Sequence, residues 1–459
     1  MKDLTQGSIP KHLISMALPM MVGMLIQTLY FLVDLYFVGK LGATALAGLS
    51  LAGNMMFLIF ALTQILNVGT SALIAQLVGS KNKEDANSIF NQSMMIATLM
   101  GLLVCILGYF AAEHYLRLIS KDEKTIQDAL SYLYWFIPCM ALQFPMLSLS
   151  AALRGTGIVK PTMVIQTISV IINIILSPIL IEGWGIGVKM GIAGAGFASS
   201  ISVVCAVVIL TLYFNRYTYY LDIKFNLWTP SFQQISRILK IGLPSGGEFF
   251  ILFCYMGLMY WLIKGFGPDA QAAFGLVSRI MQCLFLPAMA LAFAAPAIAG
   301  QNFGAKNYPR VIETFKWTAV LTSTLMAILT VISLFEAEIF LEPFAESDNV
   351  LLIAVTFLQI ISWNFVPSGL VFTCSGLFQS LGNTIPALLS TLSRLLLFIF
   401  PALWLSKQPD FALEQLWYLS MSTVCIQALI SLLLLKKEFT KRLKDIEKVT
   451  HPSVQSNSD

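Results

Sequence analysis

The chain has 459 residues, of which 57% are hydrophobic and 11% are charged, and its formal net charge is +4. A soluble domain carries about 25% charged residues, so this composition, with a mean hydropathy of +0.78, excludes an ordinary soluble protein and indicates a membrane protein. Seven cysteines fall inside apolar stretches without a CxxC pair, and three histidines lie in the tails or a loop. No disulfide, metal, haem or other cofactor is therefore expected. The chain also lacks a GxxxxGK[ST] phosphate-binding loop, which argues against an ATP-driven pump.

Twelve apolar stretches, taken in chain order, are long enough to cross a membrane as helices of about 20 residues. They cover residues 13–38, 46–78, 88–112, 128–152, 161–181, 191–214, 236–263, 271–300, 311–335, 350–378, 384–406 and 413–435. A membrane barrel would instead show alternating segments of about ten residues. The pattern predicts an all-α integral membrane protein with twelve transmembrane helices. The first stretch is longer than the roughly 7–15 apolar residues of a signal peptide, so we expect it to be retained.

The placement of positive charge predicts the orientation of the chain. With the amino terminus inside and twelve crossings, most of the 28 Lys and Arg residues fall on the inner side. This bias follows the positive-inside rule. We therefore expect a multi-pass protein of the cell (inner) membrane with both termini in the cytoplasm, where residues 439–459 form a polar tail.

An internal repeat divides the chain into two halves. Pro19 corresponds to Pro244 at an offset of 225 residues, and the same offset pairs "QLVGSKN" at Gln76–Asn82 with "QNFGAKN" at Gln301–Asn307. It also pairs Gly42 with Gly267, Ser150 with Ser375, Gly157 with Gly382 and Pro161 with Pro386. Each half holds six stretches, so the halves form a parallel repeat, and substrate sites typically lie between such halves. We predict six-helix lobes at residues 1–214 and 235–438, joined by an inner-side linker at 215–234 that lets the lobes rock.

Asp34 is the most unusual residue of the first half. It lies in "LYFLVDLYFV" with no lysine or arginine within five residues on either side. Charged groups in the membrane are costly and mark ion or substrate pathways, and burial disfavours the charged form of a carboxylate. Asp34 is therefore predicted to bind a proton or another cation. The alternative is a carboxylate that tethers helices or reaches the outer interface, since Asp34 lies about twenty residues into its helix.

Other polar residues of the first half could converge on Asp34 as a coupling network or substrate pocket. These candidates are Gln27, Tyr30, Gln64, Asn67, Asn173 and Ser177. Gln27 and Tyr30 share the helical face of Asp34, because the three residues are spaced i, i+3 and i+7. The repeat places Met259 at the position of Asp34 in the second half. This one-sided polarity indicates a binding site added to a shared scaffold.

The second half supplies two further hypotheses. Glu248 and Arg394 lie at comparable depths, so they are predicted to form a buried ion pair, with a gating role or a solvated position as alternatives. Arg279 has no evident partner. Four side chains could line an adaptable apolar pocket for varied ligands, because thioethers and rings adapt to many shapes. They are Met256, Met259, Phe285 and Met289.

The chain resembles the multidrug and toxic compound extrusion (MATE) transporters in the stretch "VDLYFVGKLGATALAGLSLA", in the "QLVGSKN" and "QNFGAKN" pair, and in a leucine-proline near the start of the first and seventh stretches. The aspartate of the first stretch, without a matching acidic residue deep in the tenth, resembles the DinF-like branch of that family. The resemblance implies an antiporter that exports cationic or amphipathic drugs in exchange for protons, with Na⁺ as the alternative coupling ion. It implies that Asp34 is the coupling carboxylate and that Asn173 and Tyr30 contact it. Ser177 stands where some relatives carry a second aspartate, which weakens a sodium site.

Two competing functions remain as alternatives. A flippase for lipid-linked precursors would need several cations in the central cavity, whereas the predicted topology places only Arg279 and Arg394 within the membrane. An intramembrane enzyme would need a catalytic pair, and Asp34 and Glu248 lie at opposite depths. We therefore expect a transporter and not an enzyme. Its expected partners are organic cations or amphipathic drugs and membrane lipids, without nucleic acid, and it is expected to act as a monomer.

Overall fold

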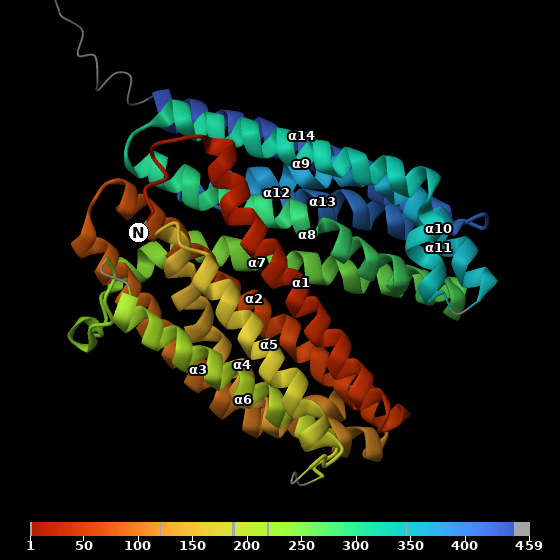
Figure 1. Ribbon diagram of the computed structural model, residues 1–459. Helices are drawn as coiled ribbons and strands as arrows, with labels where there is room; N and C mark the ends of the chain where they lie inside the picture. The colour runs from red at the N-terminus through yellow and green to blue at the C-terminus, as the bar shows by residue number, and fades with distance from the viewer. Residues whose placement is uncertain (1, 120, 186–188, 218–219, 346, 445–459) are drawn as a thin grey trace, which may run out of the picture.

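The computed structural model describes residues 2–119, 121–185, 189–217, 220–345 and 347–444 (Figure 1). Within these ranges a few side chains lie outside the described part: Phe31, Asp34, Ala43, Asn54, Phe57, Ile119, Leu443 and Lys444. The secondary structure of the described residues consists of helices, and no strand occurs among them. The first half forms α1 (Ile9–Gly39), α2 (Ala43–Gly79), α3 (Lys83–Ile119), α4 (Glu123–Gly155), α5 (Lys160–Ile181) and α6 (Ile192–Tyr217).

The second half repeats this arrangement with one interrupted helix. It forms α7 (Phe232–Ile263), α8 (Pro268–Gly304), α9 (Tyr308–Phe335), α10 (Ala337–Leu341), α11 (Asp348–Ile361), α12 (Phe365–Ser380), α13 (Ile385–Leu405) and α14 (Leu413–Lys444). A 3₁₀ turn, η4 (Ser362–Asn364), joins α11 and α12 into one span. Twelve spans of the described chain are long and apolar enough to cross a membrane, which confirms the predicted fold class and helix number.

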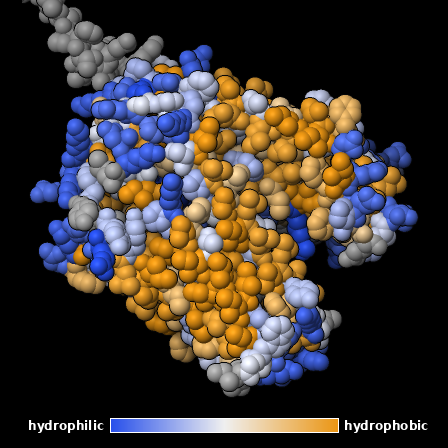
Figure 2. All heavy atoms as spheres, viewed as in Figure 1, coloured by the Kyte–Doolittle hydropathy of each residue, from blue (hydrophilic) through white to orange (hydrophobic). Residues whose placement is uncertain are grey.

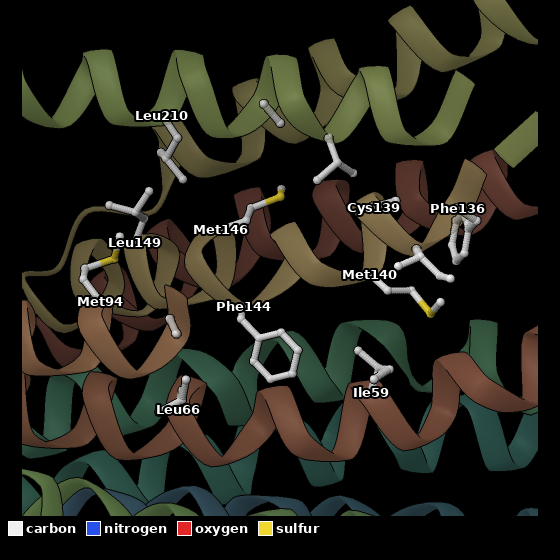
Figure 3. Close-up of a cluster of buried hydrophobic side chains, with 14 of the residues drawn as sticks. Ile59, Leu66, Met94, Phe136, Cys139, Met140, Phe144, Met146, Leu149 and Leu210 are labelled. Carbon is white, nitrogen blue, oxygen red and sulfur yellow. The ribbon is translucent and has the colours of Figure 1, made fainter. Parts of the chain in front are cut away.

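Each lobe has its own hydrophobic core. In the first lobe, side chains of α2, α3, α4 and α6 pack together, and Figure 3 shows Phe144 of α4 turned toward the helix that carries Leu66. In the second lobe, Trp417 stacks on Phe357 with a centroid distance of 3.9 Å. A third buried cluster joins the two lobes, because Ile9, Leu13 and Met16 of α1 pack with residues of α8 such as Ala294 and Ile298.

The lobes converge at the end marked N in Figure 1 and diverge toward the other end. We call these the closed end and the open end. At the closed end a Cβ on Gly79 would overlap the Gln301 carbonyl, and a Cβ on its repeat mate Gly304 would overlap the Gln76 carbonyl. The side chain of Gln76 donates to Ser380 O at 2.7 Å. Only glycine permits this close approach of α2 and α8.

The first residues of the chain bridge the two lobes at the closed end. Lys2 N donates to Thr156 O in the first lobe at 3.0 Å. Leu4 N donates to the Gln301 side chain in the second lobe at 3.0 Å, and Leu4 itself is fully buried. Arg310 Nη2 donates to Gly7 O at 2.9 Å. This bridge was not predicted, because nothing in a short polar terminus indicates what it contacts.

The linker between the lobes is tied to the first lobe rather than free. Asn87 of α3 donates to Tyr220 O at 3.0 Å and accepts from Asp222 N at 2.7 Å. Asn91, one turn later, donates to Asp222 O at 2.9 Å and accepts from Lys224 N at 2.8 Å. The two amides therefore bind the extended linker as a neighbouring strand would. The predicted rocking of the lobes about this linker stays a prediction.

The surface agrees with a membrane position. Figure 2 shows apolar atoms over the middle of both lobes and polar atoms at their two ends. Three exposed tryptophans, Trp184, Trp261 and Trp404, lie near the open-end termini of their helices. Tryptophan is enriched where membrane meets water. The apolar band therefore corresponds to the hydrocarbon region.

Candidate functional site

A cleft separates the lobes at the open end, and Figure 2 shows the molecule hollowed there. Its floor lies where α2 and α7 come together. The rings of Phe60 and Phe249 meet edge to face with centroids 5.6 Å apart. Below them, a Cβ on Gly242 would overlap the backbone of Ile65, so the two helices are in direct contact. Buried polar residues of the two lobes form three clusters among the described side chains.

The first cluster joins α1, α5 and α6 within the first lobe. The hydroxyls of Tyr30 and Ser199 share a hydrogen bond of 2.6 Å. Asn173 Nδ2 donates to Ser199 Oγ at 3.3 Å, and Ser177 Oγ donates to Asn173 Oδ1 at 3.3 Å. Asn173 and Ser177 are fully buried. The structure thus brings together three of the predicted residues and adds Ser199, which the sequence search missed because a serine among small residues carries no distinct signal.

Asp34 and Gln27 are the other two residues predicted on this face of α1. The side chain of Asp34 lies outside the described part, and the helix backbone places this residue one turn beyond Tyr30 toward the open end. Gln27 is exposed, and no hydrogen bond of its side chain to the cluster is found in the described structure.

The second cluster lies deeper, toward the closed end. Asn67 Nδ2 donates to Gln64 Oε1 at 2.8 Å, and Arg154 Nη2 donates to Asn67 Oδ1 at 2.7 Å. Arg154 Nε also donates to Ser71 Oγ at 3.2 Å. Asn67 therefore links Gln64 to Arg154, and no bond between described residues joins this cluster to that of Tyr30. Convergence on Asp34 stays a prediction, because its side chain lies outside the described part. Arg154 was missed because it lies in the last turn of its helix, where a cation is usually solvated.

The third cluster surrounds Glu248 in the second lobe. Ser375 Oγ donates to Glu248 Oε2 at 2.9 Å, and Thr391 Oγ1 donates to Oε1 at 3.5 Å. Glu248 is only 8% exposed. These two hydroxyls come from α12 and α13, and Glu248 itself lies on α7. The carboxylate therefore lies between three helices and accepts hydrogen bonds from neutral hydroxyls.

The predicted ion pair between Glu248 and Arg394 is not formed among the described side chains. The guanidinium carbon of Arg394 lies 4.4 Å from the centroid of the Tyr255 ring instead. Tyr255 is two turns of α7 beyond Glu248, toward the open end. Arg394 therefore reaches past the carboxylate and is stabilised by a cation–π contact. Arg279 is exposed.

The predicted methionine pocket is also corrected. Met259 is 2% exposed and Phe285 is 8% exposed, and both belong to the core of the second lobe, against which Met289 packs. Met256 is 37% exposed. Neighbouring residues in a helix point in different directions, so Met256 faces away from the core that buries Tyr255 and Met259. The four side chains do not line one pocket.

Comparison with known proteins adds a family match that follows the repeat. The MatE family model matches residues 19–179 and 244–404, two stretches related by the offset of 225 residues. The chain is 25% identical over 376 residues to "Probable multidrug resistance protein YoeA" of Bacillus subtilis, with 80% of each chain covered. It is 24% identical over 385 residues to "Multidrug export protein MepA" of Staphylococcus haemolyticus, with 82% of this chain and 83% of the relative covered.

Solved structures share the fold. The structure described as "Outward-facing conformation of a multidrug resistance MATE family transporter of the MOP superfamily" aligns with a TM-score of 0.89 at 23% identity, covering 96% of this chain and 98% of the other. A structure titled "Reverse polarity of binding pocket suggests different function of a MOP superfamily transporter from Pyrococcus furiosus" aligns with the same TM-score, identity and coverage. At this level of identity the likeness concerns the arrangement of the helices.

Proposed function

Because the chain belongs to the MatE family of membrane transporters, we propose that it is a multidrug efflux antiporter that exports cationic or amphipathic organic compounds in exchange for protons. The family consists of transporters and not of enzymes. The proposed cycle is alternating access, in which the two lobes open toward one side of the membrane and then toward the other. Assignment to the DinF-like branch stays a prediction.

The proposal rests mainly on the buried cluster of Tyr30, Ser199 and Asn173. This cluster lies within one helical turn of Asp34 along α1. A hydroxyl can rotate to donate either to a neighbouring hydroxyl or to a carboxylate. In the proposed mechanism, ionised Asp34 favours a cationic substrate. Protonation from the open side then neutralises it, rearranges its hydrogen bonds with Tyr30 and Asn173, and helps to release the substrate.

We assign a supporting role to Glu248. Reversing a population of two states from 1:99 to 99:1 needs about 5.5 kcal/mol of differential binding. A single carboxylate supplies this differential binding energy only if it is almost fully buried in one state and almost fully solvated in the other. Glu248 is a second buried carboxylate with neutral donors from two other helices, so its protonation would add to the difference.

The closed end is proposed to face the cytoplasm, in a cell inner membrane, with both termini inside. Lysines and arginines are more numerous at the closed end, which supports this orientation through the positive-inside rule. Closed-end examples are Lys2, Lys11, Lys81, Lys83, Lys160, Lys240, Lys306 and Arg310.

The decisive experiment measures drug export from cells that carry Asp34→Asn, with the pH gradient and the sodium gradient collapsed separately. Export by the variant should fall by about tenfold or more, the effect of about 1.4 kcal/mol. Asp269→Asn, which removes a carboxylate from the first turn of α8, is the matched control and should export normally. Undiminished export by Asp34→Asn would refute the role of Asp34. Dependence on the sodium gradient alone would reject the proton and retain antiport.

A further inference from the structure

A shallow depression of about 540 Å³ lies between α1 and α5 at the closed end. It is lined by Lys11, Ile14, Ser15, Leu18, Pro19 and Lys160. None of these residues belongs to the three polar clusters described above. We propose that this depression binds an anionic glycerophospholipid, with the phosphate on the lysines and an acyl chain on the apolar side chains. The proposal is independent of the transported substrate and of the coupling ion.

The polar part of the depression carries positive charge without a counter-charge. Lys11 and Lys160 are exposed, and Lys2 Nζ donates to Ser15 Oγ at 3.0 Å. None of the three ammonium groups lies within ion-pair distance of a described carboxylate. The carboxylate of Asp3 instead accepts two hydrogen bonds from Thr5, at 2.6 and 2.8 Å. Clustered ammonium groups at the end of membrane helices attract anionic headgroups.

The apolar part of the depression favours a lipid over a free phosphate. Lys11 lies in the first turn of α1 and Lys160 begins α5, so both lie at the level of the headgroups. Ile14 and Leu18 are 52% and 54% exposed, one and two turns deeper along α1. Lysines at the interface with apolar side chains beneath them match the two parts of a phospholipid.

The position on α1 gives the site a mechanical consequence. Ile9, Leu13 and Met16 lie on the opposite face of the same turns and are buried against the second lobe. Residues three and four apart share a face of a helix, so one face of α1 seals the joint and the other carries the lipid. A bound lipid would therefore hold α1 against α5 while the opposite face of α1 packs on the second lobe.

The test uses the purified full-length protein in neutral detergent and native mass spectrometry. The protein is titrated with phosphatidylglycerol, with phosphatidylcholine of the same acyl chains, and with glycerol phosphate alone. Phosphatidylglycerol should bind most tightly. Lys11→Gln combined with Lys160→Gln should weaken its binding by about 30-fold, which corresponds to about 1 kcal/mol for each lysine. Lys11→Arg with Lys160→Arg should retain binding, because the charge is kept.

A matched control removes two lysines elsewhere at the closed end, by Lys240→Gln with Lys316→Gln. Both lysines are exposed and lie in other helices. This control should bind phosphatidylglycerol within about twofold of the unmodified protein. An equal loss in the control would show a general charge effect and overturn the site. Equal binding of phosphatidylcholine, or saturation by glycerol phosphate at the same concentration as the lipid, would also overturn it.

Discussion

The hydroxyl of Tyr255 on α7 shares a hydrogen bond of 2.8 Å with Ser420 Oγ on α14. Tyr30, which precedes Tyr255 by the repeat offset of 225 residues, makes the same kind of bond with Ser199 on α6. Each tyrosine thus joins the first helix of its lobe to the sixth. A tyrosine–serine bond occurs in both lobes, whereas its surroundings differ between them.

The two tyrosine–serine bonds differ in the side chain that lies next to them. In the first lobe, Asn173 donates to Ser199 Oγ, whereas in the second lobe the ring of Phe398 lies 5.0 Å from that of Tyr255. An amide can exchange hydrogen bonds and a phenyl ring cannot. This difference supports the proposal that protonation of Asp34 is coupled to the hydrogen bonds of the first lobe.

This symmetry provides a matched pair of variants. Tyr30→Phe and Tyr255→Phe each remove one hydroxyl from a hydrogen bond to serine, so each should lower the free energy of unfolding by about 1 kcal/mol. Only Tyr30→Phe should reduce drug export and change its dependence on external pH. The measurements are denaturant unfolding in mixed micelles and export at several pH values. Equal effects of both variants on export would assign Tyr30 to the scaffold alone.

The surroundings of Glu248 predict which pairs of residues are energetically coupled. In a double-mutant cycle on unfolding, Glu248→Gln and Ser375→Ala should show coupling of about 1 kcal/mol, because a buried charge-assisted bond is lost. The cycle of Glu248→Gln with Arg394→Gln should give less than about 0.5 kcal/mol. Restored export on exchanging the charges of Glu248 and Arg394 would contradict the observed geometry.

The close packing at two glycines of the closed end predicts that one added methyl group will destabilise the protein. Gly79→Ala and Gly304→Ala each place a Cβ on a backbone carbonyl of the other lobe. Overpacking of this kind costs about 1–3 kcal/mol, so both variants should lower the unfolding midpoint. Gly257→Ala is the control, since nothing lies within 4 Å of its added Cβ. If all three variants melted alike, the close approach of α2 and α8 would be refuted.

The tethered linker predicts local protection from hydrogen exchange. Asn91→Ala removes the acceptor of Lys224 N and the donor to Asp222 O. Exchange around Lys224 should then accelerate, while α3 itself stays protected because its backbone bonds remain. Gln233→Ala, at an exposed position on α7, serves as control. Unchanged exchange in Asn91→Ala would mean that the linker is held by other contacts.

The twelve helices and the repeat could be predicted from the sequence. Each helix follows from the apolar residues of one stretch, and the repeat follows from a constant offset along the chain. A run of about 20 apolar residues must satisfy its own backbone within the membrane, which leaves the helix as the choice for such a segment. The gapless offset between Pro19 and Pro244 recurs in the two stretches that match the family model. The spacing of polar residues on helix faces also indicated Tyr30, Asn173 and Ser177. The structure places these three side chains in one hydrogen-bonded cluster.

Partners across helices depended on the tertiary structure. Composition does not specify how far a helix is rotated or shifted along its axis, and a shift of one turn moves a side chain by about 5.4 Å. This explains why Arg394 lies over Tyr255 instead of meeting Glu248, and why Met259 is part of a core. The sequence by itself determined the helices and their repetition, because those follow from hydrophobicity along the chain. Rotation and depth within the bundle decided the polar contacts, because those depend on all neighbouring helices at once.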